Sequence, residues 1–456
     1  MTALLNQEQI EKYNIPGPRY TSYPTAVQFE PIDNFSLTEY LSYINRSPRD
    51  VSIYLHLPFC ASLCWYCGCT TVITRNQDKA DVYLKILEKE LENLSMLLHP
   101  QHKVKQIHYG GGTPTFLTPS QLQRLGKLLH KYLNIDLNTE FGVEIDPRSF
   151  TKAHLDAMME FGMNRASIGM QDINPEVQEA IHRIQPVDMV QQTVNLLRQA
   201  GITSINLDII YGLPKQTRIR FQNTLKAIDS LQPDRLAIYS YAHVPWIKPA
   251  QKLLKDKDLP TPEEKLFLLQ DAMHYMEKLG FNHIGMDHFA RPDDELAIAL
   301  REGTLQRNFQ GYSTLSGLDL YGLGMSSISS VGSYYFQNEK HLESWEQAIN
   351  KYGFAWNKGL KLNPEDEFRR SIIMEIMCSR QLNFRDIWNK WYINPLEHFK
   401  HELKALKPFE DDGIVEVSAE GIIILPKGRH FLRNIAMVFD QYLNMKREKP
   451  TFSKTL

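Results

Sequence analysis

The sequence has few cysteines, almost no net charge and no long apolar run. Five of its 456 residues are cysteine, and four of these fall between positions 60 and 69, which argues against a fold held by disulfides. The formal charge of −2 gives no general field that would attract nucleic acid or an anionic membrane, so an acidic ligand must be held by local arginines. No stretch approaches the roughly 18 apolar residues of a membrane span, and the first residues lack the pattern of an export signal. We therefore expect a cytoplasmic protein with no membrane span and no nucleic-acid partner.

The length and the apolar content predict a large folded region with appendages. At 456 residues the chain exceeds one ordinary core, and 43% hydrophobic residues suffice to bury a sizeable interior. Pro16, Pro18 and Pro24 give the beginning of the chain the character of an extended arm. We predict three parts: an N-terminal arm (1–50), a main domain with an extension (51–345) and a mainly helical C-terminal domain (346–456).

Strand-like apolar runs alternate with segments of helical periodicity through the main domain. The predicted strands are 51–57, 104–110, 140–145, 164–170, 204–210 and 235–241, and the predicted helices are 77–98, 118–133, 151–161, 187–200 and 217–231. Thr118 and Pro119 are typical of a helix N-cap and first turn. A repeated strand–helix pattern predicts a parallel α/β sheet, in this chain an incomplete barrel of six units, with working residues where the strands end.

The last hundred residues follow another pattern. Helical runs at 364–379 and 395–406 precede two short strands, 414–417 and 422–425, and a final helix that begins near residue 427. Helices followed by a hairpin and a helix are typical of a winged-helix module, but this shape alone does not establish DNA binding. We expect a lid or a domain-packing role.

Cys60, Cys64 and Cys67 stand in HLPFCASLCWYCGC, directly after the first predicted strand. Thiolates this close can share one centre, because a cluster with several irons offers separate corners to ligands on one loop. Three ligands would leave one iron of a four-iron cluster open to a substrate. The alternatives are a zinc site, which usually draws ligand pairs from separate segments, and a redox pair that would leave Cys60 and Cys69 unexplained. The spacing favours the cluster, whereas Cys378 lies in an apolar run and is expected to be a core residue.

Polar or glycine residues collect at the ends of the other predicted strands. Each alone is typical of a turn or a helix cap, but together they predict a binding rim on the side of the cysteine loop. The residues are Gly110 to Thr115 (GGGTPT), Glu144, Gln171 and Asp172, Asp208, and Ala242 and His243. Glycines let a ligand approach the backbone, and carboxylates can accept hydrogen bonds from an ammonium or from ribose hydroxyls. Tyr66 either stacks on a purine or packs beneath the loop.

These features carry a resemblance to a known family. A CxxxCxxC loop on the first strand of a six-unit barrel, followed by a glycine-rich second strand end, resembles the radical S-adenosylmethionine (SAM) superfamily. Longer motifs make nearly the whole chain similar to the oxygen-independent coproporphyrinogen III oxidase family. They include PGPRYTSYPTA, the CxxxCxxCxC pattern, HYGGGTPT, VEIDPR, LDIIYGLPKQT, GMDHFARPDDELA and RNFQGY.

The resemblance implies an incomplete (β/α)6 radical SAM barrel with one 4Fe-4S cluster on Cys60, Cys64 and Cys67, and two molecules of SAM. The implied reaction is the oxidative decarboxylation of two propionate side chains of coproporphyrinogen III to vinyl groups, which gives protoporphyrinogen IX in haem biosynthesis. Hydrogen abstraction by a 5′-deoxyadenosyl radical starts it, and this requires a cluster of low potential. An unidentified low-potential electron donor is therefore implied, and we expect a monomer.

Residues that have a role in the family can be assigned in this sequence by their position in the shared motifs. Those that match the SAM site beside the cluster are Tyr54, Tyr66, Gly111, Glu144 and Ile328, and those that match the second SAM site are Gly112, Thr113, Gln171, Arg183, Asp208 and Ala242. Position 66 is commonly phenylalanine in relatives, and tyrosine keeps the stacking face. We assign Tyr54, His56 and Cys69 to the catalytic centre. Cys69 matches a cysteine that is not expected to bind iron, and it either lies near the substrate or is inert packing.

A substrate with four carboxylates requires local cations. Arginine suits this task because its planar fork meets a carboxylate through two hydrogen bonds. The candidates are Arg19, Arg291 and Arg307, with His56 and His288 able to orient a propionate. Ordinary ion pairs or packing are the alternative for each of them.

A second function remains open. Haem chaperones related to this family keep the three-cysteine loop without the oxidase activity. Cys69 and the complete PGPRYTSYP arm favour the oxidase, because those relatives usually lack both. A radical enzyme that modifies nucleic acid is disfavoured by the charge.

Overall fold

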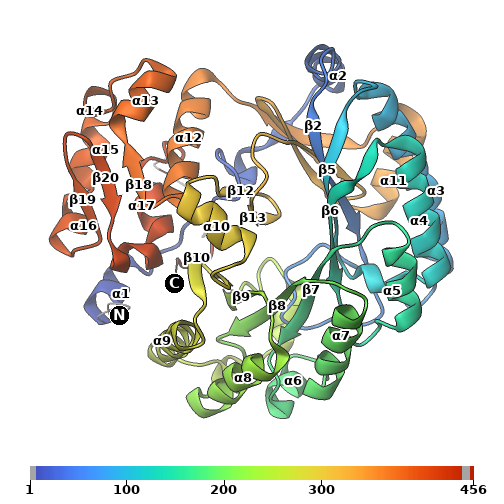
Figure 1. Cartoon of the computed structure of the whole chain (residues 1–456), viewed down its shortest axis with the longest axis horizontal. Coiled ribbons are helices and arrows are strands. Elements are labelled where there is room, and N and C mark those ends of the chain that lie inside the picture. Colours follow the sequence, from blue (N-terminus) through green and yellow to red (C-terminus); the bar gives the residue numbers. More distant parts are fainter. Residues whose placement is uncertain (1–6, 444–451, 456) are drawn as a thin grey trace.

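A large twisted sheet organises the molecule (Figure 1). The computed structural model describes residues 7–443 and 452–455. Six adjacent strands of the sheet are parallel: β2 (Asp50–Leu57), β5 (Lys103–Gly111), β6 (Ile135–Ile145), β7 (Arg165–Gln171), β8 (Ser204–Tyr211) and β9 (Arg235–Ser240). They are the six strands that the sequence predicts, and only β6 begins well before its predicted start. Strands β2 and β5 are mostly buried, whereas buried residues alternate with partly exposed ones along β7 and β8.

Helices return the chain from each parallel strand to the next. They lie along the outside of the curved sheet (Figure 1) and are α3 (Asp78–Leu97), α4 (Pro119–Tyr132), α5 (Lys152–Met159), α6 (Pro175–Ala180), α7 (Val187–Gln199) and α8 (Arg218–Leu231). Thr118 caps α4 through a reciprocal capping box with Gln121, and Pro119 occupies the first turn, as predicted. The short α6 was not predicted. This arrangement leaves the carboxyl ends of all six strands at one rim.

The sheet continues beyond the six strands on both sides. On the β2 side follow β14 (Asp319–Leu323), β15 (Ile328–Val331), β16 (Tyr334–Asn338), β17 (Trp356–Lys361) and β1 (Glu30–Pro31), and on the β9 side β11 (His288–Ala290) and β10 (Asn282–Gly285). Strand β14 is parallel to β2, whereas the others pair in antiparallel fashion. The flanking helices are α2 (Asn34–Ile44), α9 (Pro262–Lys278), α10 (Glu295–Glu302) and α11 (Leu342–Tyr352), and β12 (Gln306–Asn308) and β13 (Gly311–Ser313) form a separate hairpin.

The C-terminal region shares a second hydrophobic core with the N-terminal arm and with residues between Ile284 and Tyr312, and it has a small sheet of order β18-β20-β19. Its elements are α12 (Pro364–Cys378), β18 (Gln381–Asn383), α13 (Phe384–Trp391), α14 (Pro395–His398), α15 (Lys400–Ala405), α16 (Lys407–Asp411), β19 (Val415–Val417), β20 (Gly421–Ile424) and α17 (Leu432–Val438). The predicted final helix begins later than expected, because Pro426–His430 form a 3₁₀ turn before α17. A winged-helix identity for this region stays a prediction.

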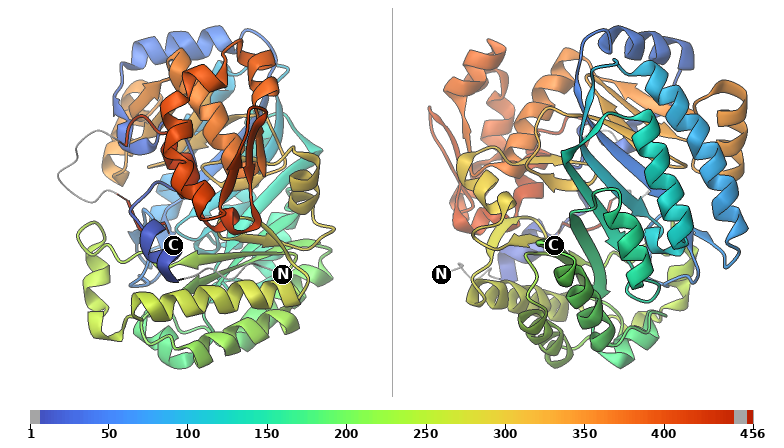
Figure 2. Two further views of the ribbon diagram at one scale, coloured as in Figure 1. Left: turned by 90° about the vertical axis from the view of Figure 1, so that its left-hand side faces the viewer. Right: turned by 45° about the vertical axis from the view of Figure 1, so that its right-hand side comes forward.

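The N-terminal arm lies against the C-terminal region (Figure 2). Helix α1 (Gln7–Tyr13) places the Tyr13 ring against Phe409 and Phe431, with ring centroids 4.7 and 5.1 Å apart. Arg433 donates to the carbonyls of Pro18 and Gly17. The second half of the predicted arm, with α2 and β1, instead packs on the large sheet. Since β17 continues that sheet past residue 345, we propose that the C-terminal domain begins after Lys361.

Among residues 7–443 and 452–455, no helix combines the length and apolarity needed to cross a membrane.

Candidate active site

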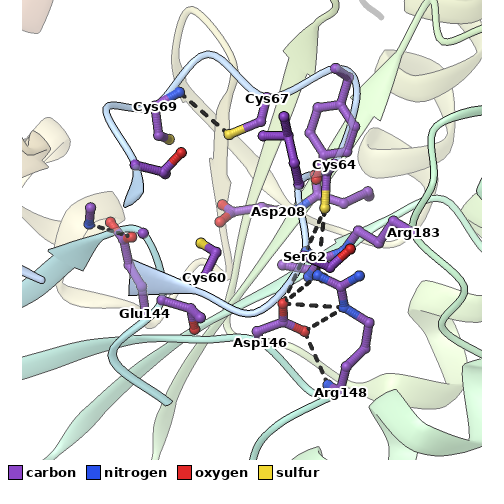
Figure 3. A pocket seen from close by; sticks show the side chains of 18 of the residues that line it. Cys60, Ser62, Cys64, Cys67, Cys69, Glu144, Asp146, Arg148, Arg183 and Asp208 are labelled. Atoms are coloured by element: carbon purple, nitrogen blue, oxygen red, sulfur yellow. Dashed lines mark hydrogen bonds and ion pairs between the residues drawn. The ribbon is translucent and has the colours of Figure 1, made fainter. Parts of the chain in front are cut away.

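The cysteine loop lies at the rim where the parallel strands end (Figure 3). After β2, the two-residue strand β3 (Phe59–Cys60) pairs in parallel with β4 (Val72–Ile73), and this pairing closes the intervening loop. Inside the loop the Cys67 N–H donates to the Cys64 carbonyl at 3.0 Å. The side chains of Cys60, Cys64, Cys67 and Cys69 line one pocket.

The end of β5 supports this loop from below. The Gly112 N–H donates to the Leu57 carbonyl at 2.8 Å, and the Thr113 N–H donates to the Phe59 carbonyl at 2.9 Å. A Cβ on Gly112 would lie 2.5 Å from the carbonyl carbon and oxygen of Pro58, so no larger residue fits there without moving backbone. The glycine run therefore sets how closely β5 approaches the segment that carries Cys60.

The donor set fits an iron–sulfur cluster. Hydrogen bonds from the side chain and N–H of Cys69 lower the pKa of the Cys67 thiol to about 6, whereas burial raises that of Cys60 to about 12. Bound iron would favour the thiolate at both positions. In the described part of the chain no three His, Cys, Asp or Glu side chains converge on a point that would hold a single ion. A cluster does not require such convergence, because each thiolate binds a different iron.

A buried ion-pair group lies beside Cys64, and sequence reasoning missed two of its members. Asp146 accepts from Arg148 at 2.7 Å and from Arg183 at 3.2 Å. The same guanidinium groups lie 3.5 and 3.6 Å from the Cys64 sulfur (Figure 3). Burial alone would raise the pKa of Asp146, but the two arginines outweigh it and hold that pKa below its ordinary value. Asp146 and Arg148 stand in the motif VEIDPR, where the strand-end position was the available signal.

Glu144 and Asp208 bring two carboxylates to the same pocket. The Gly111 N–H donates to Glu144 at 3.3 Å, and His108 lies 3.3 Å from the same carboxylate. Asp208 accepts from Asn206 at 2.8 Å and from Ser167 at 3.2 Å. Burial and the charge of Glu144 raise the pKa of Asp208 to about 6. Acceptors held in this way suit a ligand that carries an ammonium group or hydroxyls.

Gln171 and Arg183 meet at the end of β7. Gln171 has a left-handed backbone, with φ at 64°. A Cβ on Gly169 would lie 2.7 Å from the Gln171 amide nitrogen and 3.1 Å from Arg183, so this glycine makes room for both side chains. Thr113 and Tyr66 line the same pocket. These predicted residues are therefore brought together.

A second pocket opens on the other side of Glu144. It is lined by Tyr54, His56, Cys69 and Ile328, together with Phe309, Gln310 and Ser326, which were not predicted. The Tyr54 hydroxyl lies 3.2 Å from His56, whose other ring nitrogen lies 2.9 Å from the Thr70 carbonyl. Burial lowers the pKa of His56. Cys69, Gly111 and Glu144 line both pockets and connect them.

Ala242 lies in neither pocket. It borders a third cavity beyond the end of β9, together with Arg19. Gln251 links this segment to the cysteine loop, because its amide donates to the carbonyls of Tyr66 at 3.1 Å and Ala242 at 3.2 Å. The cavity at Ala242 therefore adjoins the cysteine loop.

Three of the four candidate substrate ligands lie near one another. Arg19 forms an ion pair with Asp287, and Arg307 donates to the carbonyls of Arg19 and Tyr20. His288 lies next to Tyr312, on which Arg307 also stacks. Burial and Arg307 lower the pKa of His288 to about 3, so its ring is neutral at physiological pH.

Arg291 is separate from this group. Its guanidinium donates to the Pro233 carbonyl at 2.9 Å, and its backbone N–H donates to the Asp234 carbonyl at 3.0 Å. These contacts lie where β9 begins, at the opposite end of the strand from the cysteine loop. The structure therefore does not bring Arg291 together with the other candidates, and its role in substrate binding stays a prediction.

Comparison with known proteins first shows the class of protein to which this chain belongs. A sequence model of the Radical SAM superfamily matches residues 54–228, which include the whole cysteine loop. The chain is 44% identical to the oxygen-independent coproporphyrinogen III oxidase of Escherichia coli K12, with 98% of this chain and 97% of that protein covered. For the Helicobacter pylori J99 protein of the same name the identity is 42%, with 98% and 99% covered.

A solved structure indicates the same family. Coproporphyrinogen III oxidase from Escherichia coli, described as a radical SAM enzyme, aligns with a TM-score of 0.92 at 42% identity and covers 97% of this chain and 100% of that one. The fold and the cysteine loop are those of a radical SAM protein. The chain belongs to the oxygen-independent coproporphyrinogen III oxidase family.

Proposed function

We propose that this protein is an oxygen-independent coproporphyrinogen III oxidase that converts two propionate side chains of its substrate to vinyl groups in haem biosynthesis. The observation that carries the proposal is the cysteine loop at the mouth of the parallel sheet, in a chain that is similar to these enzymes over its whole length. Each conversion removes CO₂, one hydrogen atom and one electron from a propionate. An acceptor of unidentified nature takes the electron.

A 4Fe-4S cluster and SAM, when bound, supply an electron and the species that abstracts hydrogen. Cys60, Cys64 and Cys67 are the proposed ligands, because they share one loop and one pocket. Arg148 and Arg183 place positive charge next to the Cys64 sulfur. Such charge stabilises a thiolate and makes a nearby redox centre easier to reduce.

We further propose that the two connected pockets hold two SAM molecules. Glu144 and Gly111 border both pockets and offer a carboxylate and a glycine backbone to the molecule beside the cluster, for which Tyr54, Tyr66 and Ile328 are further contacts. Asp208, Gln171, Arg183, Gly112 and Thr113 serve the second molecule from the end of the sheet, and Ala242 borders the adjoining cavity. Thr113 and Arg183 are buried, in a setting where hydrogen bonds are strong.

His56 and Cys69 are the proposed catalytic residues beside Tyr54. They line the pocket next to the cluster, and the ring of His56 is fixed between Tyr54 and the Thr70 carbonyl. A neutral imidazole has one N–H, which the Thr70 carbonyl accepts, so His56 acts by accepting from the Tyr54 hydroxyl and holding it in place beside the substrate. We also propose a monomer in the cytoplasm, where a reducing environment protects thiolate ligands.

The test is an anaerobic assay after reconstitution with iron and sulfide. The reduced protein, SAM and coproporphyrinogen III should give protoporphyrinogen IX together with 5′-deoxyadenosine, and Cys64→Ala should give neither. Cleavage of SAM without vinyl formation, or tight haem binding without turnover, would contradict the proposal and favour the haem chaperone.

A further inference from the structure

A third cavity lies beyond the ends of β8 and β9, and the proposed chemistry does not use its charged residues. Helix α9, the N-terminal arm and residues 452–454 complete its wall. We call it the Lys265 pocket, after one of the residues that line it. Its charged side chains are Arg19, Lys265 and Lys454, and none of the described residues that line it is an aspartate or a glutamate.

Lys265 reaches this pocket because the end of β8 makes room for it. Its stem crosses Gly212, where a Cβ would lie 2.8 Å from the Lys265 Cε. Gly212 also has a left-handed backbone, with φ at +84°, which disfavours other residues. Beyond the glycine, the ammonium donates to the Tyr241 carbonyl at 2.9 Å. Two independent properties of Gly212 thus permit this path of the lysine.

The Lys265 ammonium has no carboxylate partner in the described part of the chain. Asp287 is paired with Arg19, and Asp256 is paired with His243. Lys454 is held close by the pairing of its backbone with Pro16, and it adds a second charge of the same sign. Burial and Lys454 lower the pKa of Lys265 to about 8. A largely desolvated cation without a counter-charge is costly, so the arrangement is complete only with an anion.

The remaining walls are apolar and aromatic. Tyr241 and Phe452 line the cavity, and Trp246 at its border is 60% exposed. Ala242 also borders it, and Gln251 links that residue to the cysteine loop through the Tyr66 carbonyl. Aromatic side chains and cations in one cavity suit a largely apolar molecule that carries carboxylates.

We propose that the Lys265 pocket binds a propionate carboxylate of coproporphyrinogen III, one that is not reacting, and so positions the macrocycle beside the cluster. This inference rests on the proposed function. Lys265 is then a binding residue for the substrate, with Lys454 and Arg19 as neighbouring cations. The competing source of a carboxylate is the methionine part of SAM, which the measurements below distinguish.

The test compares Lys265→Met with Lys278→Met in the reconstituted enzyme. Lys278 is an exposed lysine at the end of the same helix and serves as the matched control. Lys265→Met should raise the KM for coproporphyrinogen III about tenfold, because one charge-assisted hydrogen bond is lost, and should leave the KM for SAM near the wild-type value. Lys278→Met should leave both unchanged. Lys265→Arg, which keeps the charge, should recover most of the affinity.

Binding of coproporphyrin III supplies a second measurement that does not need turnover. Lys265→Met should weaken its binding about tenfold, but should not alter binding of the tetramethyl ester, which carries no charge. Iron content and thermal unfolding report whether each variant is folded. If the wild type is active and Lys265→Met keeps its KM and its affinity for coproporphyrin, the inference is wrong. A rise in the KM for SAM alone would also overturn it, whereas an inactive wild type would count against the proposed function.

Discussion

At the scale of single residues, the ion pairs of Asp146 support the cluster loop. Asp146 is buried and pairs with both Arg148 and Arg183, which lie beside the Cys64 sulfur. Removing one partner of a buried ion pair leaves charge without compensation. We expect Asp146→Asn to lower the free energy of unfolding by about 3 kcal/mol in denaturant titrations.

The matched control is Asp156→Asn, which breaks an exposed pair with Lys152 and should cost less than about 0.5 kcal/mol. Because the pKa of Asp146 lies below its ordinary value, its contribution to stability is present above that ordinary value and is lost as the pH falls through the lower one. Equal effects of the two substitutions at pH 7 would contradict this role.

Asp208 is expected to have the opposite effect on how stability depends on pH. Its pKa is raised to about 6, mainly by burial, so the folded protein holds a proton that the unfolded chain has lost above about pH 4. Stability should therefore decrease as the pH rises from about 4 to 6. Asp208→Asn should remove this decrease and raise the free energy of unfolding at pH 8 by about 1–2 kcal/mol. Melting curves at pH 5 and 8 test this, and an unchanged difference between the two pH values would refute it.

Residue roles were predictable from sequence only where a motif stood at a strand end. Glu144, Asp208 and the cysteines met this condition, and they line the cluster pocket. Asp146 was missed because its second partner, Arg183, lies 37 residues away and only the fold brings them together. The placement of Arg291 away from the rim was not predictable, because its motif does not reveal that the guanidinium donates to the carbonyl of Pro233.

At the scale of elements, the contact of β5 with the β2–β3 connection determines the position of the cysteine loop. We expect Gly112→Ala to reduce the iron bound after reconstitution to less than about half, because its Cβ would meet the Pro58 backbone and push the loop away. In Gly142→Ala on β6 the nearest atom is a His108 ring nitrogen at 3.2 Å, which can move. Wild-type iron content in Gly112→Ala, measured with unchanged circular dichroism, would contradict this steric account.

The parallel strands were predictable because each is a short segment with apolar residues at consecutive or alternating positions between turn signals. The antiparallel strands that extend the sheet were not predictable. Strands such as β15 (ISSV) and β17 (WNKGLK) are short and mix polar with apolar residues, so their structure depends on the neighbouring strand with which they pair. These strands form only when distant parts of the chain come together. Ile328 reaches the second pocket because it lies on one of them, β15.

At the scale of the whole molecule, Arg433 fastens the N-terminal arm to the C-terminal region. Its guanidinium is buried and donates to the carbonyls of Gly17 and Pro18 in the arm and of Lys454 and Thr455 near the end of the chain. Arg433→Met would leave these carbonyls without their donor, at a cost of about 1–3 kcal/mol. We expect faster proteolysis within residues 7–25 and a lower melting temperature.

The control is Arg385→Met, an exposed arginine of the same region. It should change neither the cleavage rate nor the melting temperature. Identical cleavage patterns for the two variants would show that Arg433 does not hold the arm. The sequence indicated an extended arm from its prolines, but its docking site could not be predicted, because it depends on side chains more than 400 residues away.

Transfer of hydrogen from a propionate to SAM-derived 5′-deoxyadenosine tests the central claim most directly. Coproporphyrinogen III deuterated at the propionate carbons next to the macrocycle is supplied to the reconstituted, reduced protein, and the products are analysed by mass spectrometry. We predict one deuterium in 5′-deoxyadenosine for each vinyl group formed, and none with Cys64→Ala. Vinyl formation without deuterium transfer, or 5′-deoxyadenosine that lacks deuterium, would contradict the proposed function.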